Sequence, residues 1–218
     1  MKNYDAVVFD MDGVIFDSER AIMECWIEQA EKMGMEFMEE HFHACIGVNL
    51  QKTREIMLEA YGEDFPFDEF DKQASALFHA KYDGGRLPIK SGVREIIDYL
   101  KSSNKKIALA TSTKKTSVIR RLSEAGLLEY FDEIVTGDMV THSKPHPEIY
   151  LFACEKIGVK PEDAYAIEDS YNGIRSATSG GLRTIMVPDL LPANDEMHEL
   201  AEIVLDNLND VIKYLDKM

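Results

Sequence analysis

Apolar residues recur at two kinds of spacing along the chain, and each kind predicts a different element. From about residue 18 to residue 84 they return at helical spacing, without a convincing strand. This spacing predicts helices over about residues 18–34, 52–61 and 67–82. The expected apolar face of the first helix is Ile22, Trp26, Ala30 and Met33. This part of the chain is therefore expected to be helical throughout.

After about residue 87 short apolar runs alternate with amphipathic stretches. Together with a run near the N-terminus, these predict buried strands over residues 6–9, 106–110, 133–135, 164–167 and 184–187. A last helix is expected after Asn207, with Leu208, Val211, Ile212 and Leu215 on its apolar face. Strands that alternate with helices predict a doubly wound α/β domain with a mostly parallel sheet. Residues 1–15 and 87–218 are then the α/β core, and residues 16–86 are an inserted helical domain.

Polar side chains follow the expected strands at the points where these strands end. In an open α/β sheet, ligands bind outside the carboxyl ends of the strands. The chain places there Asp10 and Asp12, then Thr111, Ser112 and Thr113, and then Glu168 and Asp169. Lys144, followed by Pro145, lies in a connection that precedes another helix. We expect these residues to form one site.

The residue types in this set suit phosphoryl transfer. Carboxylates such as Asp10 and Asp12 bind hard cations like Mg²⁺, which usually comes with substrate phosphates, and an aspartate can act as a covalent nucleophile. Thr111 and Ser112 open a helix whose N–H groups can bind an anion, and Lys144 can neutralise phosphate oxygens. Taken singly, each motif is also common as a solvated turn, a helix cap or an exposed lysine. Their coincidence at strand ends favours a single phosphoryl-transfer site.

Composition narrows the classes of partner. Lys plus Arg number 24 and Asp plus Glu number 40, which gives a net charge of −16 and argues against nucleic-acid or anionic-membrane binding. The three cysteines, Cys25, Cys45 and Cys154, lie far apart, as reduced thiols do. The first strand starts too early to leave room for a signal peptide, and no apolar run approaches the roughly 20 residues that span a bilayer. We expect a cytoplasmic monomer.

The order of the motifs resembles the haloacid dehalogenase superfamily over essentially the whole chain. The segments that carry the resemblance are Asp10-Met11-Asp12-Gly13-Val14, Thr111-Ser112, Ser143-Lys144-Pro145 and Glu168-Asp169-Ser170. Together with Asp17-Ser18-Glu19 and Ile149-Tyr150, they are similar to the subgroup of β-phosphoglucomutases and small sugar-phosphate phosphatases. The resemblance implies an enzyme that acts on a small-molecule phosphate ester.

The resemblance also implies a role for each residue. Asp10 would be the nucleophile that forms an aspartyl-phosphate, and Asp12 the general acid and base. The Thr111 hydroxyl and the Ser112 backbone would bind the transferring phosphoryl group, and Lys144 would hold its oxygens. Asp12 must be protonated when the substrate is bound, and we expect the neighbouring carboxylates to favour that proton through like-charge repulsion.

Mg²⁺ is the cofactor that the resemblance implies. Asp169 would bind it together with Asp10 and the backbone carbonyl of Asp12, with Glu168 supporting or joining that group of ligands. The phosphate dianion repels an incoming carboxylate, so Mg²⁺ and Lys144 must cancel charge before Asp10 attacks.

The helical insertion would be a mobile cap that selects the substrate. Its specificity loop is expected at residues 44–49, with Gly47 and Asn49 as substrate contacts. A β-phosphoglucomutase has an arginine three residues after that glycine, which clamps a second phosphate, whereas this chain has Leu50. This departure favours a phosphatase over a mutase.

Basic residues keep a second anion site open. They are Lys52, Arg54, Lys114 and Lys115, and we count Lys114, with Ser112 and Thr113, among the substrate-binding candidates. Two non-enzymatic alternatives are a phosphoacceptor signalling domain and a sugar-phosphate sensor. The second aspartate of the Asp-x-Asp motif and the cap favour an enzyme over the signalling domain, and the presence of every reactive group argues against the sensor.

Overall fold

The computed structural model describes residues 4–46 and 50–218. It divides into two compact units, one of Met1–Asp17 with Pro88–Met218 and the other of Ser18–Leu87. Gly47 and Asn49, the expected substrate contacts of the cap, lie outside the described residues. Within those residues, no helix has both the length and the apolar character that crossing a membrane requires.

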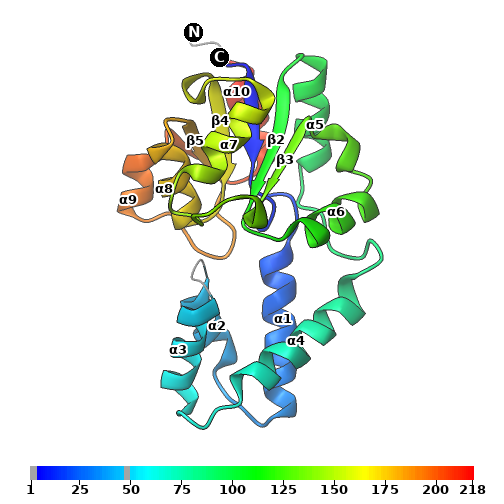
Figure 1. Ribbon diagram of the computed structural model, residues 1–218, viewed down its shortest axis with the longest axis vertical. Coiled ribbons are helices and arrows are strands. Elements are labelled where there is room, and N and C mark those ends of the chain that lie inside the picture. The colour runs from blue at the N-terminus through cyan, green and yellow to red at the C-terminus, as the bar shows by residue number, and fades with distance from the viewer. Residues whose placement is uncertain (1–3, 47–49) are drawn as a thin grey trace. The chain divides into compact units, whose positions relative to one another are not determined.

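The larger unit is built on a parallel sheet, which confirms the predicted fold class (Figure 1). The order of its six described strands is β3-β2-β1-β4-β5-β6, and every neighbouring pair is parallel. The strands are β1 (Ala6–Phe9), β2 (Lys106–Thr111), β3 (Glu133–Thr136), β4 (Ala164–Glu168), β5 (Arg183–Met186) and β6 (Ile203–Val204). Because β1 pairs with both β2 and β4, the residues that follow these three strands lie at one edge of the sheet.

Helices alternate with these strands. They are α5 (Val93–Ser102), α6 (Lys115–Glu124), α7 (Glu148–Ile157), α8 (Tyr171–Ser179), α9 (Asp195–Leu200) and α10 (Leu208–Leu215). Short 3-10 turns occur at η1 (Leu128–Tyr130), η2 (Gly137–Met139) and η3 (Pro161–Asp163). Side-chain caps start three of the helices: Ser170 accepts from the Gly173 N–H, Asn194 from Met197 and Asn207 from Asp210.

One face of the sheet is lined by small side chains. The residues that pack there are Ala6, Val8, Ala108, Ala110, Val135, Ala164 and Ala166. Helix α7 covers this face with Ile149, Tyr150, Ala153 and Cys154 (Figure 1). Small side chains on the strands let the helix pack closely, at the density usual for a protein interior. The packing fixes the start of α7, and with it Tyr150, close to the carboxyl ends of β1, β2 and β4.

The smaller unit is helical, with α1 (Ser18–Lys32), α2 (Met38–Cys45), α3 (Leu50–Tyr61) and α4 (Phe67–Tyr82). Its core is aromatic: the ring of Trp26 meets Phe42, Phe67 and Phe70 edge to face, at centroid distances of 5.3, 6.5 and 5.2 Å. The sequence did not predict α2. This helix follows Phe37, whose backbone is left-handed (φ 60°), and that residue makes no side-chain cap.

The predicted apolar face of α1 needs a correction. Met33 lies beyond the end of the helix and is exposed, and Ile22 is only half-buried. Trp26 and Ala30 are buried as predicted, and Ala21, Met23, Cys25 and Gln29 are buried with them. The prediction continued a helical period past Lys32, where the chain turns at Gly34 with φ 69°.

Candidate active site

The side chain of Lys144 lies between two carboxylates at the ends of adjacent strands. Its Nζ donates to Asp10 Oδ1 at 2.7 Å and to Glu168 Oε1 at 2.6 Å. Asp10 directly follows β1, and its N–H donates to the Ile167 carbonyl of β4 at 3.0 Å. The ammonium also donates to the Ala110 carbonyl of β2 at 3.0 Å. The three strands therefore meet at one buried ammonium, as the strand-end argument predicted for Asp10, Lys144 and Glu168.

Tyr150 belongs to the same group, although the sequence analysis gave it no role. Its hydroxyl donates to Glu168 Oε1 at 2.7 Å and lies 3.4 Å from Lys144 Nζ, which also sits 5.0 Å from the centre of its ring. Burial, followed by the charges of Glu168 and Asp10, holds the pKa of Tyr150 well above its ordinary value. The tyrosine therefore stays a neutral donor that orients Glu168.

Burial and charge act in opposite directions on the central pair. Burial raises the pKa of Asp10 well above the usual range of an aspartate; Lys144 lowers it, and Glu168 and Asp12 raise it further. Burial disfavours the charged form of Lys144, but Asp10 and Glu168 outweigh that effect and hold the pKa of the ammonium above its ordinary value. One lysine does not neutralise the carboxylates around it.

The acidic residues of this group suit a hard divalent cation. Asp10, Glu168 and Asp169 are buried and each offers a carboxylate oxygen, all within 4.8 Å of one another. Such an all-oxygen set is what Mg²⁺ binds. Asp169 reaches this place because Gly13 leaves room: a Cβ there would lie 2.2 Å from Asp169 Oδ2, and Gly13 has φ +80°. The backbone carbonyl of Asp12 as a further ligand stays a prediction.

Glu168 is the most heavily hydrogen-bonded member of this set. Besides the two bonds to Oε1, its Oε2 accepts from the N–H groups of Asp169 and Ser170, each at 3.2 Å, and from Ser170 Oγ at 3.0 Å. The backbone of Gly173 packs directly against the carboxylate, where a Cβ would lie 1.9 Å from its carbon. These contacts fit a residue that holds Lys144 in place and supports the cation ligands.

Asp12 also contacts two side chains that were not expected as its partners. Its Oδ1 accepts from Arg121 Nη1 of α6 at 2.8 Å, and its Oδ2 accepts from Thr113 Oγ1 at 2.6 Å. The sequence analysis expected neighbouring carboxylates to favour a proton on Asp12. Both carboxylate oxygens thus contact a polar side chain, and the proton expected on Asp12 stays a prediction. The sequence did not single out Arg121, because this residue lies on a helix. Helical periodicity does not indicate which side chain reaches the end of a strand.

The remaining expected phosphate contacts follow β2. Thr111 is buried, and its hydroxyl oxygen accepts from the Thr113 N–H at 3.1 Å, whereas Ser112 and Lys114 are exposed. The Ser112 carbonyl packs against Gly137, where a Cβ would lie 2.2 Å away. Helix α6 starts here, but the N–H of Lys115 donates to Asp138 Oδ1 at 3.0 Å. The backbone of this turn is thus only partly open to an anion.

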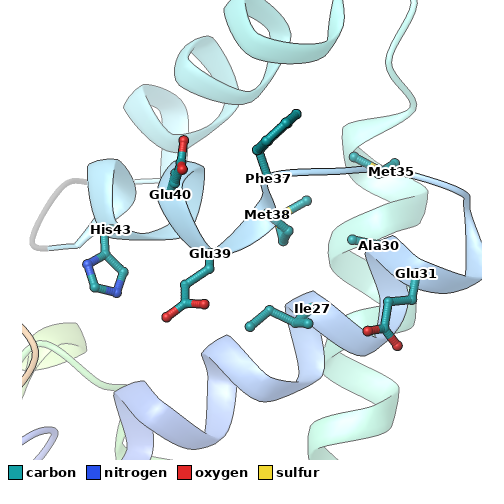
Figure 2. Close-up of a pocket in the computed structure, with 9 residues that line it drawn as sticks. All are labelled: Ile27, Ala30, Glu31, Met35, Phe37, Met38, Glu39, Glu40 and His43. Carbon is teal, nitrogen blue, oxygen red and sulfur yellow. The ribbon is translucent and has the colours of Figure 1, made fainter.

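Two of the basic residues considered for a second phosphate are engaged within the helical unit. Arg54 is ion-paired with Asp68, and its guanidinium lies 4.8 Å from the centre of the Phe67 ring. Lys52 Nζ lies 3.0 Å from Glu55 Oε2. A pocket of this unit lies between α1 and α2. It is lined partly by Ile27 of α1 and by Met38, Glu39 and His43 of α2 (Figure 2). None of the lining residues was a sequence candidate.

Comparisons with known proteins identify the family. The model of the haloacid dehalogenase-like hydrolases matches residues 7–187. The chain is 36% identical over 181 residues, 83% of both sequences, to a phosphorylated carbohydrates phosphatase of Thermotoga maritima. It is 26% identical to hexitol phosphatase B of Escherichia coli, over 94% of this chain and 93% of that protein. The structure of CbbY from Rhodobacter sphaeroides in complex with phosphate has a TM-score of 0.74 at 27% identity, over 95% of this chain and 96% of that one.

The chain therefore belongs to the haloacid dehalogenase-like hydrolases, and the resemblance drawn from its motifs is confirmed. It is an enzyme, as the sequence predicted. The roles of the individual site residues are not tested by these similarities and stay predictions.

Replacing Gly173 by alanine should destabilise the protein by about 1–3 kcal/mol, since the added methyl group collides with the Glu168 carboxylate. Urea unfolding measures the change. Gly180→Ala is the matched control at the end of the same helix, where a Cβ would come no closer than 3.3 Å to another atom. Equal stabilities of the two variants would contradict the close packing of Gly173 on Glu168.

Proposed function

We propose that this phosphoric monoester hydrolase acts on small phosphorylated carbohydrates, with Mg²⁺ and an aspartyl-phosphate formed on Asp10. The observation that carries the proposal is the buried Lys144 ammonium, which lies 2.7 Å from Asp10 Oδ1 beside the acidic residues Glu168 and Asp169. The named substrates of the similar phosphatases, phosphorylated carbohydrates and hexitols, support the substrate class. We also propose that the helical unit selects the substrate.

In the first step a carboxylate oxygen of Asp10 attacks phosphorus and the bond to the sugar oxygen breaks. Lys144 would move from its carboxylate partners to the phosphoryl oxygens, and the Thr111 hydroxyl would donate to them. Asp10, Asp169 and Glu168 would hold Mg²⁺, which when bound supplies positive charge against the phosphate dianion. The departing alkoxide takes a proton from Asp12.

In the second step water attacks the phosphorus of the aspartyl-phosphate and Asp12 accepts the proton of that water. The bond between phosphorus and the Asp10 oxygen breaks, which frees Asp10 and releases inorganic phosphate. For this step Asp12 must be a carboxylate, and its contacts with Arg121 and Thr113 support that form. In the first step the same residue must instead release these partners and carry a proton to the leaving group. The ion pair thus fits the second half of the cycle, in which Asp12 acts as a base.

The contacts of the helical unit favour hydrolysis. Leu50 cannot bind a phosphate, and Arg54 is already paired with Asp68. A mutase must hold the second phosphate of a bisphosphate intermediate, which requires a dedicated cation. Among the described residues of the helical unit, we find no cluster of cationic side chains arranged to bind that phosphate.

Asp10→Asn should reduce turnover on the order of a thousandfold or more, because an amide does not form the acyl-phosphate bond. Phosphate release from a sugar phosphate measures the loss, and an acid quench with labelled substrate measures the phosphoenzyme. Asp5→Asn, an exposed aspartate that precedes the same strand, is the control. Substantial activity or labelling of Asp10→Asn would overturn the assignment of the nucleophile.

Metal binding should release a proton and tighten as the pH rises from about 6 to about 8. Burial favours the protonated form of Asp10 at neutral pH, whereas a bound cation requires the carboxylate. Titration calorimetry with Mg²⁺ in two buffers of different ionisation enthalpy counts the proton. Asp10→Asn should abolish the release, and Asp169→Asn should weaken binding. A pH-independent affinity, or full activity after chelation, would contradict the proposed cation site.

Arg121→Gln should lower kcat by about tenfold with little change in KM, because Asp12 loses the partner that orients it as a base. Steady-state phosphate release and the steady-state level of phosphoenzyme check this, and the phosphoenzyme should accumulate. Arg120→Gln, the neighbouring residue on α6, is the control. Equal kinetics for the two variants would show that the Arg121 contact plays no part in turnover.

Incubation with β-glucose 1-phosphate distinguishes hydrolysis from the mutase reaction. We expect free phosphate to dominate, also with other sugar monophosphates, and no activation by a trace of β-glucose 1,6-bisphosphate. Glucose 6-phosphate and free phosphate are followed together. Dominant glucose 6-phosphate with activation by the bisphosphate would establish the mutase, and Lys114 and Lys115 would then be the first residues to test for the second phosphate.

A further inference from the structure

A second group of metal-type ligands lies outside the residues that the proposed reaction uses. It consists of His142, His146 and Glu148, in the segment that leads into α7. His142 Nδ1 lies 2.8 Å and His146 Nδ1 4.0 Å from the same carboxylate oxygen, Glu148 Oε2. The two imidazole rings are tilted by 32° with their centres 4.5 Å apart. His142 thus contacts the carboxylate oxygen directly, and His146 Nδ1, which accepts from the Glu148 N–H at 3.3 Å, lies close to it.

We propose that His142, His146 and Glu148 bind a divalent cation of the Zn²⁺ class. Zn²⁺ takes imidazole nitrogens and carboxylate oxygens at about 2.0–2.2 Å, so ligand atoms in a tetrahedral site lie about 3.3 Å apart. The distances of 2.8 and 4.0 Å bracket this value, and small side-chain rotations reconcile them. Imidazole ligands select Zn²⁺ and similar ions over Mg²⁺. The site is thus chemically distinct from the all-carboxylate group at Asp10.

The carboxylate of this site is held in place by the backbone. Glu148 Oε1 accepts from the Thr141 N–H at 2.8 Å, and Oε2 accepts from the His142 N–H at 2.9 Å. Glu148 is also the first residue of α7, which is anchored in the core by Ile149 and Tyr150. Hydrogen bonds of this kind orient a ligand before the metal arrives. The imidazoles are exposed, 61% for His142 and 51% for His146, so a cation reaches them from solvent.

The site encloses the segment that carries Lys144. In the chain Lys144 lies midway between the two histidines, and the far end of the segment is tied to α8 by Ser176 Oγ, which donates to the His146 carbonyl at 2.7 Å. A bound cation would link both ends of the segment to the start of α7. It would therefore stabilise the fold and act on Lys144 only through the position of the segment.

Imidazole ¹H–¹⁵N spectra of the full chain test the site directly. Mg²⁺ is added in excess to occupy the acidic group. We then expect Zn²⁺ to shift the ring-nitrogen resonances of His142 and His146, and to leave those of His198 in the α/β unit and His79 in α4 unchanged. Calorimetry gives the affinity, which His142→Gln and His146→Gln should each reduce at least about tenfold. The melting temperature should rise with Zn²⁺ in the parent and not in these variants.

Two matched variants distinguish this site from others. His79→Gln removes an exposed imidazole that pairs with Asp83 at 3.0 Å. This pair contains a single imidazole, so the substitution should leave Zn²⁺ binding unchanged. Asp169→Asn impairs the acidic group and should also leave it unchanged. Zn²⁺ affinity that survives His146→Gln, or that is lost in Asp169→Asn, would overturn the proposal. Unshifted His142 and His146 resonances at millimolar Zn²⁺ would overturn it as well.

Discussion

The site depends on one buried ammonium, that of Lys144, held between the carboxylates of Asp10 and Glu168. Burying these charges is costly, and their mutual attraction offsets the cost only where hydrogen bonds complete the geometry. The Tyr150 hydroxyl and the Ala110 carbonyl supply those bonds. The packing of α7 on the small-residue face of the sheet places Tyr150, and Ala110 belongs to β2 of that sheet. The order of β2, β1 and β4 and the alanines of their shared face are therefore constraints on the active site as much as on the core.

The carboxylates at this edge are distinguished by their partners. Asp10 and Glu168 share Lys144, Asp12 is paired with Arg121, and Asp169 fits against Gly13. One ammonium leaves negative charge around Asp10, which favours a cation and, without one, a proton. Asp12 has its own cation, Arg121, which distinguishes it from Asp10. Identical functional groups thus acquire different chemistry from their surroundings, which is the common basis of acid–base assignments.

The sequence predicts those parts of this arrangement that depend on local pattern. Short apolar runs identified β1 to β5, and the rule that ligands bind at strand ends brought Asp10, Lys144 and Glu168 together. Strand β6 was not predicted because its two residues are only half-buried. Helix α2 was not predicted because no capping side chain precedes it. Tyr150 and Arg121 lie on helices, where periodicity marks a face and says nothing of which strand end the face meets. Their roles follow from tertiary packing alone.

The pairing of Asp12 with Arg121 limits how the cycle can run. In the proposed mechanism Asp12 gives a proton to the leaving group, so one of its oxygens must first release Arg121 or Thr113. The cost of breaking these contacts must be met by substrate binding, because the alkoxide of a sugar leaves poorly without a proton. In the proposed cycle these contacts would form again once the sugar has left. In this proposal Arg121 would make the first step depend on a bound sugar.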